Sequence, residues 1–100
     1  MAVGMLITGE GVTHDLYVQL TKKMFGNYPM RDDQAPEGLI IHTAGKTADG
    51  FYVYDIWESK KHFQRFAEKQ LGPAARELSG GKGGDLEPEF NEIEMLVKGR

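Results

Sequence analysis

The sequence contains no cysteine, so disulfide bonds, thiolate metal sites and cysteine nucleophiles are excluded. It also lacks a long apolar run, and nothing in it is therefore predicted to span a membrane. The N-terminal residues lack the basic segment that opens a secretory signal. Basic residues are scattered and the formal net charge is −3, so no basic stripe marks a nucleic-acid surface. We expect a cytoplasmic protein that binds neither nucleic acid nor membrane.

The composition is that of a folded domain. Hydrophobic residues make up 40% and charged residues 27% of the 100 residues, which is ordinary for a globular protein. This length suits a single domain over residues 1–100. A domain of this size buries only about two-thirds of its unfolded surface, so its thin core would gain from apolar surface buried in an assembly.

Apolar and β-branched residues predict four strands, over residues 3–8, 39–44, 51–57 and 92–97. In the last strand, Ile93, Met95 and Val97 would share one face.

Two helices are predicted between these strands. Thr13 can cap the first helix, which a Gly-Asn pair ends at residues 26–27. Ser59 can cap the second, which Gly72 and Pro73 interrupt before a last turn or separate short helix over residues 74–78. The residues predicted to face inward on the second helix are Phe63, Phe66, Ala67, Gln70 and Leu71. Residues 28–36 are predicted to form an irregular loop, and the glycine-rich residues 80–84 a flexible one.

This order of elements predicts an α+β protein of ferredoxin-like topology, βαββαβ, with an antiparallel sheet and both helices on one face. Two helices cover only one face of the sheet, yet the central strands are apolar on both. Strand 51–57 alternates Phe51, Val53 and Trp57 with Tyr52, Tyr54 and Ile56, and strand 39–44 is predicted to place Ile40 opposite Leu39 and Ile41. Because a monomer would leave this second face exposed, we expect a homodimer that buries it.

Parts of the sequence resemble the dimeric α+β barrel superfamily, in its antibiotic biosynthesis monooxygenase-like branch, which includes many small actinobacterial proteins. The resemblance rests on residues 38–45, the turn at residues 49–50 and residues 53–59, with further matches at Phe63, Phe66, Leu71 and Pro73. It implies a sheet-to-sheet dimer with a pocket between sheet and helices in each protomer. In that branch the pocket binds polycyclic aromatic substrates. The enzymes oxidise them with molecular oxygen and without a metal, flavin or haem cofactor. The superfamily also holds isomerases, cyclases and proteins with no known activity, so the fold alone does not select a function.

His42 and Asp55 are the candidate catalytic residues. A histidine titrates near neutral pH and can take a proton from a phenol or enol. A carboxylate among apolar neighbours needs a hydrogen-bond partner or a raised pKa, and either suits acid–base chemistry. The alternatives are a structural histidine, and an aspartate paired with a Lys or Arg at the sheet rim. One residue of hairpin register decides whether His42 faces Asp55 and Trp57 or faces Tyr52 and Tyr54.

Trp57 is the first candidate for substrate binding, as the aromatic wall of a pocket. The alternative is a core tryptophan packed under the second helix. Tyr28 and Arg31 lie in the long loop, where a lid over the pocket would sit, although solvated loop residues are the alternative. The remaining candidates for substrate binding are Phe51, Val53 and Phe63. His14 and His62 lack a second ligand at metal-site spacing, so no metal site is expected.

Three functions fit these residues. The first is a cofactor-independent monooxygenase acting on a planar aromatic or polyketide-like small molecule. The second is a cyclase or isomerase that uses the same pocket without oxygen. The third is a non-catalytic ligand-binding or structural dimer.

Overall fold

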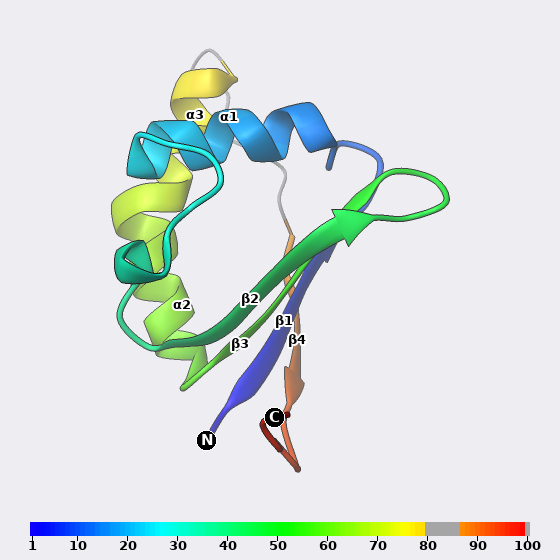
Figure 1. Ribbon diagram of the computed structural model, residues 1–100, viewed down its shortest axis with the longest axis vertical. Helices are drawn as coiled ribbons and strands as arrows, with labels where there is room; N and C mark the ends of the chain where they lie inside the picture. Colours follow the sequence, from blue (N-terminus) through cyan, green and yellow to red (C-terminus); the bar gives the residue numbers. More distant parts are fainter. Residues whose placement is uncertain (80–86, 100) are drawn as a thin grey trace.

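The computed structural model describes residues 1–79 and 87–99, and its sheet holds four strands in the order β2-β3-β1-β4, each antiparallel to its neighbours. The topology is ferredoxin-like, as predicted, and the glycine-rich loop predicted over residues 80–84 lies outside the described residues (Figure 1). The elements in chain order are β1 (Val3–Thr8), α1 (His14–Phe25), η1 (Asp32–Gln34), β2 (Leu39–Lys46), β3 (Phe51–Trp57), α2 (Lys60–Phe66), η2 (Ala67–Leu71), α3 (Gly72–Leu78) and β4 (Glu89–Glu92).

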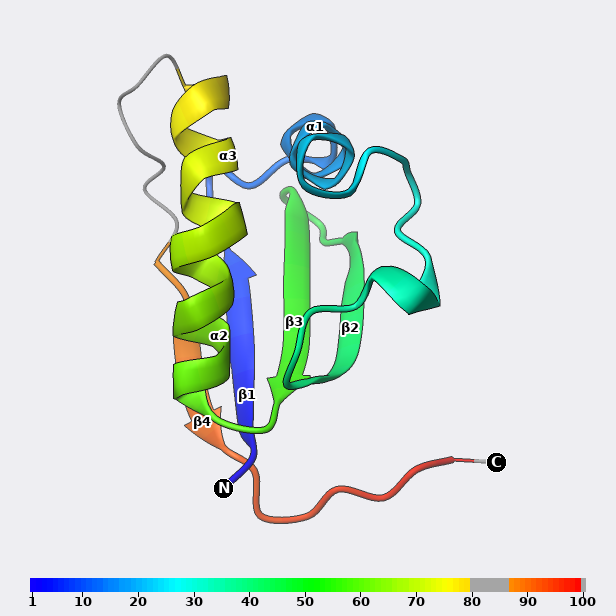
Figure 2. The ribbon, with the colours of Figure 1, turned by 90° about the vertical axis from the view of Figure 1, so that its left-hand side faces the viewer.

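The helices lie on one side of the sheet. Figure 2 shows α1 end-on above the strands, with the helical run from α2 to α3 standing alongside them. In Figure 1 no helix of the described residues covers the opposite side of the sheet. No helix in the described part of the chain is long and apolar enough to cross a membrane.

Both predicted helix caps are confirmed. The Thr13 hydroxyl accepts a hydrogen bond from the backbone N–H of Leu16 at 3.1 Å, and Ser59 accepts one from His62 at 3.3 Å. Helix α1 ends at Gly26, whose φ of 83° is left-handed and whose N–H reaches the Lys22 carbonyl. These local signals determine where both helices begin and where α1 ends.

The helix after β3 does not break at Gly72 and Pro73. Residues Ala67–Leu71 form one π-helical turn, and the right-handed helical backbone continues through it into α3. Pro73 is the second residue of α3 and follows the π turn directly, where the regular i→i−4 hydrogen-bond pattern is already interrupted. The π turn also alters the facing of the side chains, and Gln70, predicted to face inward, is exposed.

A register shift at the start of β2 corrects the predicted faces of that strand. Leu39 lies opposite Trp57 on the helix-covered face, whereas Ile41 lies opposite Ile56 on the other face. The prediction that Leu39 and Ile41 share a face is therefore wrong. An irregularity at Ile40 changes the alternation that a regular strand would keep.

The last strand is also displaced from its predicted place, since β4 spans Glu89–Glu92 and not residues 92–97. Phe90 lies opposite Met5 and packs edge-on against Phe63 at 5.6 Å. Because β1 begins at Val3, residues after Glu92 extend past the strand with which they would pair. The alternating apolar residues therefore gain no ladder, and Met95 and Val97 are 80% and 78% exposed.

The buried side chains form two clusters. The larger joins the sheet to α2 and contains Met5, Ile7, Val12, Phe51, Trp57 and Phe63. The smaller joins α1 to α3 and contains Leu20, Ala74 and Ala75. Leu71 packs against both clusters, and the candidate site lies between them.

Candidate functional site

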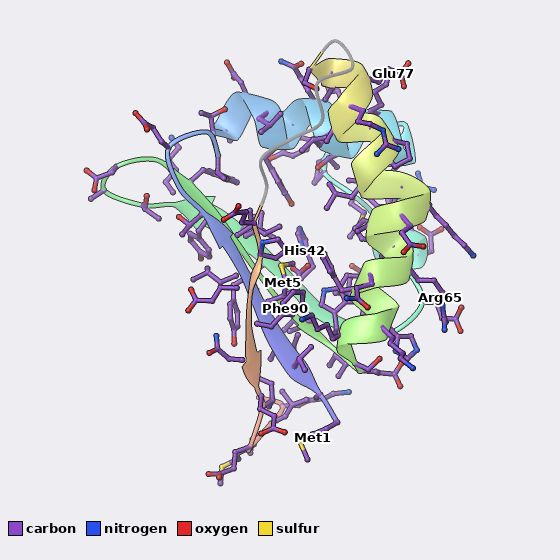
Figure 3. All side chains as sticks on the ribbon, turned by 180° about the vertical axis from the view of Figure 1, so that it is seen from behind. Met1, Met5, His42, Arg65, Glu77 and Phe90 are labelled. Atoms are coloured by element: carbon purple, nitrogen blue, oxygen red, sulfur yellow. The ribbon has the colours of Figure 1, made fainter. Side chains whose placement is uncertain are left out.

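A single row of side chains crosses all four strands on the helix-covered face. His42 lies opposite Asp55, Asp55 opposite Met5, and Met5 opposite Phe90. Figure 3 shows His42, Met5 and Phe90 together in the middle of the sheet. The register thus places His42 with Asp55 and Trp57, and not with Tyr52 and Tyr54.

Asp55 is 4% exposed and both of its carboxylate oxygens have partners. Nδ1 of His42 lies 2.6 Å from Oδ1, and the indole N–H of Trp57 donates to Oδ2 at 3.2 Å. No Lys or Arg approaches this carboxylate within ion-pair distance among the described residues, so the alternative of a rim ion pair is wrong. A buried carboxylate held by two donors is satisfied, and the short contact to His42 is typical of a charge-assisted hydrogen bond.

The other ring nitrogen of His42 contacts Tyr17, since Nε2 lies 2.6 Å from the phenol oxygen. Because the ionised Asp55 only accepts, we assign the Nδ1–H tautomer, in which Nε2 accepts the proton of Tyr17. The result is a series of hydrogen-bonded side chains, Tyr17–His42–Asp55–Trp57, that joins α1, β2 and β3. We call this series of four side chains the relay.

Tyr17 was not among the residues singled out from the sequence. It lies three residues before Leu20 and seven before Met24, both on the apolar stripe of the helix, and this spacing could have placed its phenol on the inner face. Burial raises the pKa of the Tyr17 phenol, and the neighbouring Tyr28 raises it further. The phenol is therefore protonated at neutral pH and is the donor toward His42.

A cavity of about 80 Å³ adjoins the relay, between the sheet, α1 and α2. The polar side chains at its wall are those of Tyr17, His42 and Asp55, with Thr13 and Thr21. The His42 side chain is 25% exposed, so the imidazole is accessible despite its two hydrogen bonds. Most of the remaining wall is apolar and includes Met5, Ile7, Leu20, Leu39, Val53 and Phe63.

The predicted substrate-binding residues of the strands and α2 fall into two groups. Val53 and Phe63 line the cavity. Phe51 packs against the Tyr17 ring at 5.1 Å, behind the cavity wall. Trp57 is 1% exposed and packs against Phe63, so it is a core tryptophan and not the wall of a pocket. Its indole N–H also donates a hydrogen bond to Asp55.

The two loop candidates, Tyr28 and Arg31, lie outside the cavity wall. Tyr28 is 39% exposed and meets the Tyr17 ring edge-on at 6.0 Å. The Arg31 guanidinium pairs with Asp33 at 3.0 Å and its side chain is 62% exposed. Arg31 thus belongs to the structure of the loop and does not reach the relay.

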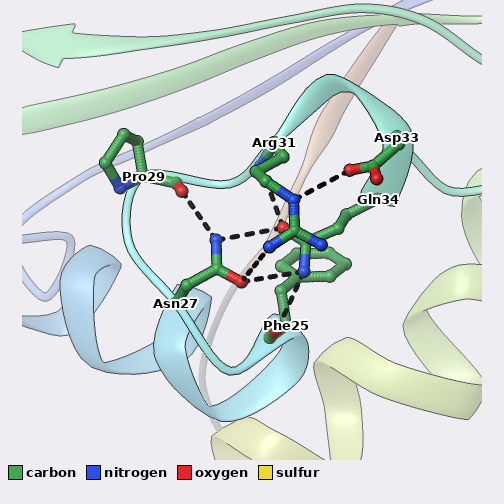
Figure 4. A network of polar contacts seen from close by, with 6 residues as sticks. All are labelled: Phe25, Asn27, Pro29, Arg31, Asp33 and Gln34. Atoms are coloured by element: carbon green, nitrogen blue, oxygen red, sulfur yellow. Dashed lines mark hydrogen bonds and ion pairs between the residues drawn. The ribbon is translucent and has the colours of Figure 1, made fainter.

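That loop is organised around Gln34, as Figure 4 shows. Its amide N–H₂ donates to the Phe25 carbonyl at 2.9 Å and to Asn27, while its oxygen accepts from the backbone of Arg31 at 2.9 Å. These bonds tie η1 to the end of α1. The segment predicted as irregular is therefore an ordered lateral wall beside the cavity.

Within residues 1–79 and 87–99, no group of three or more His, Asp or Glu side chains is placed to hold a metal ion. The acid–base chemistry available at the cavity is that of the relay.

No protein-family model matches the sequence, and no curated protein matches it. The fold, in contrast, matches solved structures. One is a candidate antibiotic biosynthesis monooxygenase from Deinococcus radiodurans, with 11% identity and a TM-score of 0.59 over 100% of this chain and 99% of the other. A protein of unknown function from Nitrosomonas europaea is 17% identical, with a TM-score of 0.52 over 99% of this chain and 91% of the other.

A third similar structure is SnoaB, a cofactor-independent oxygenase from Streptomyces nogalater. It is 16% identical, with a TM-score of 0.52 over 96% of this chain and 94% of the other. These similarities cover nearly the whole chain, including the part that the motifs did not cover. The chain therefore shares the α+β fold of these solved structures.

Proposed function

We propose that the protein is a cofactor-independent oxygenase that acts on a small, planar, electron-rich molecule, with His42 as the general base. The observation that carries this proposal is the relay at the wall of an apolar cavity: Tyr17, His42 and Asp55 are linked by two contacts of 2.6 Å. In such an arrangement the carboxylate orients the imidazole and stabilises its protonated form, so the imidazole is a better general base. The fold shared with SnoaB supports the same reaction class.

The chemistry begins with a proton transfer. A substrate bound in the cavity presents an acidic hydrogen to Nε2 of His42, in the place that the Tyr17 proton otherwise takes. Asp55 stabilises the imidazolium that results. Tyr17, held protonated by its raised pKa, donates to the oxyanion of the substrate.

The second stage consumes molecular oxygen. The carbanion form of an activated methylene transfers one electron to dioxygen, and the radical pair combines to a hydroperoxide at that carbon. Loss of the remaining hydrogen on that carbon, with departure of water, leaves a carbonyl. Overall, R₂CH₂ and O₂ give R₂C=O and H₂O, so the substrate supplies all the electrons and no further reductant is needed.

Oxygen uptake with single-ring aromatic compounds that carry an acidic methylene group beside the ring tests the proposal. We expect His42→Gln to lower kcat by about a hundredfold, because proton transfer by a positioned base contributes at least that much. His14→Gln is the matched control, since His14 is exposed and lies outside the relay. Wild-type protein that binds such compounds without consuming oxygen, or a His42→Gln variant with full activity, would contradict the proposal.

A cyclase or isomerase is the second candidate. The observation that favours it is the direct contact of a proton donor, Tyr17, with a proton acceptor, His42, which could move a proton between two atoms of one substrate. Product formed at equal rates with and without oxygen would select this function. The non-catalytic alternative gains support from the filled space around Trp57, but a structural aspartate needs no imidazole with an accessible edge.

We also propose that two chains pair through the uncovered face of the sheet, as the fold family implies. Ile41 is 49% exposed there, and the half-buried Leu6, Tyr54 and Ile56 lie beside it. A second copy of the same face would remove these side chains from water. A cytoplasmic location, the absence of a cofactor and a small-molecule partner stay predictions of the same proposal.

A further inference from the structure

A second hollow lies outside the cavity, on the flank of the helical run. It is a groove of about 240 Å³ between residues 34–37 of the loop and one side of α2 and η2. Polar side chains line most of it, in contrast to the cavity. They are Gln34, Glu37, His62, Arg65, Lys69 and Gln70.

The groove and the cavity share two walls. Pro36, from the loop, and Phe66, from α2, line both hollows. Phe66 packs against the core, with ring centroids 5.5 Å from Trp57 and 6.5 Å from Phe25. Pro36 lies between Gln34, which ties the loop to α1, and Gly38, whose carbonyl accepts the N–H of Glu58. The two hollows are thus neighbours that share one proline and one aromatic ring as their common wall.

The groove carries excess positive charge. The groove is lined by two cations, Arg65 and Lys69, and by one carboxylate, that of Glu37. Neither cation forms an ion pair with any residue in the described part of the chain. Figure 3 shows Arg65 extending from α2 on the side away from the sheet. In a chain of net charge −3, this groove is a local site of attraction for an anion.

The cavity alone is too small for a typical ligand. Its volume of about 80 Å³ lies well below the roughly 300 Å³ at which ordinary ligand pockets begin. It has room for one ring beside the relay, so the rest of a larger substrate must extend through a wall. Pro36 and Phe66 form the wall that the cavity shares with the groove, so a ligand that extends past these two residues reaches the groove.

We propose that cavity and groove form one binding site for an aromatic carboxylate. The ring, with its acidic hydrogen, occupies the cavity beside His42, and the carboxylate lies in the groove against Arg65 and Lys69. The planar guanidinium of Arg65 suits a carboxylate, because its N–H donors match the two oxygens. This inference rests on the proposed function in one respect, that the aromatic ring of the substrate binds in the cavity. It names the substrate class of that site.

Calorimetric titration with matched ligands tests the inference. The probes are 4-hydroxyphenyl alkanoates with two to six methylene groups between ring and carboxylate, each compared with its neutral methyl ester. We expect the acid that spans both hollows to bind the wild type about tenfold more tightly than its ester, as one charge-assisted contact allows. That preference should shrink as salt is added.

The double variant Arg65→Gln/Lys69→Gln should lose the preference for the acid and bind the ester within about twofold of the wild type. The control is Lys22→Gln/Lys46→Gln, which removes the same charge at exposed positions that line neither hollow. The control should keep the tenfold preference, which separates a local contact from the effect of net charge. Tyr17→Phe, at the cavity wall, should weaken acid and ester alike.

Equal affinity for acid and ester in the wild type would overturn the inference. So would a preference that survives in the double variant or disappears in the control, and so would no binding of any probe. Oxygen uptake distinguishes these outcomes from a failure of the proposed function. An acid bound with the expected preference but never oxidised leaves the binding site standing and removes only the oxygenase.

Discussion

The two faces of β3 consist of alternate residues of one strand, yet they differ in kind. The helix-covered face holds Phe51, Asp55 and Trp57, each no more than 5% exposed. The opposite face holds Tyr52, Tyr54 and Ile56, which stay half-buried with no helix above them. The first face is complete within one chain, including the hydrogen bonds of its charged residue. No helix in the described part of the chain covers the second face, so mutations should act on stability at the first face and on the proposed dimer at the second.

The largest effect is expected at the covered face. Trp57→Ala should lower the free energy of unfolding by about 3–5 kcal/mol, because it opens a cavity and removes a donor from Asp55. Trp57→Phe keeps much of the volume and should cost less than half of that. Urea unfolding of both variants measures the difference. A loss below about 1 kcal/mol in Trp57→Ala would show that Trp57 is not a core residue.

A charge on the uncovered face tests the other half of the comparison. Ile41→Glu should weaken the proposed dimer by about a hundredfold, since the carboxylate would be buried without a partner, and should leave the protomer folded. Sedimentation velocity at micromolar concentration, with circular dichroism as the control for folding, measures both. Wild-type protein that sediments as a single chain contradicts the dimer, whatever the variant does.

Asp55→Asn addresses the relay itself. An asparagine has one accepting oxygen, so its amide N–H₂ would face either Trp57 or His42, each of which donates to Asp55. We expect His42 to switch to the Nε2–H tautomer and the unfolding free energy to fall by about 1–3 kcal/mol. Imidazole ¹⁵N chemical shifts report the tautomer. Asp49→Asn, exposed in the hairpin turn, should change neither quantity.

The smallest effect concerns alkaline pH. The folded protein holds the Tyr17 pKa above 10, whereas the unfolded chain titrates near 10. Above pH 10 the unfolded state therefore binds fewer protons than the folded one, and stability falls as pH rises from there toward the folded pKa. Tyr17→Phe should remove this contribution while costing about 1 kcal/mol at neutral pH. Denaturation midpoints of both proteins between pH 8 and pH 11 measure it, and identical profiles would contradict the assignment.

The features that the sequence predicted well are those with a local cause. Thr13 and Ser59 cap helices because their hydroxyls reach a backbone N–H within one turn. The pairing of His42 with Asp55 was one of two possibilities, and choosing between them required the hairpin register. The register of β2 against β3 also shifts at Ile40, and no residue pattern predicts this shift.

The features that were missed have causes distant in sequence. Tyr17 meets His42 across 25 residues, so only the folded arrangement shows it as part of the relay. The last strand was misplaced because the alternation of Ile93, Met95 and Val97 outweighed the single half-buried Phe90. Alternation predicts a strand only where a neighbouring strand is present, and β1 has ended there.

The π turn at Ala67–Leu71 sets the angular relation between the two ends of the long helix. A π turn holds one residue more than an α turn, and one residue corresponds to about 100° around a helix axis. Phe63 and Phe66 face the sheet before the turn, while Ala74 and Ala75 face α1 after it. A shortened turn would restore a regular helix and rotate the alanines away from Leu20. The added residue therefore acts as a rotational joint that lets one helix serve two differently oriented partners, with the cavity in the space between them.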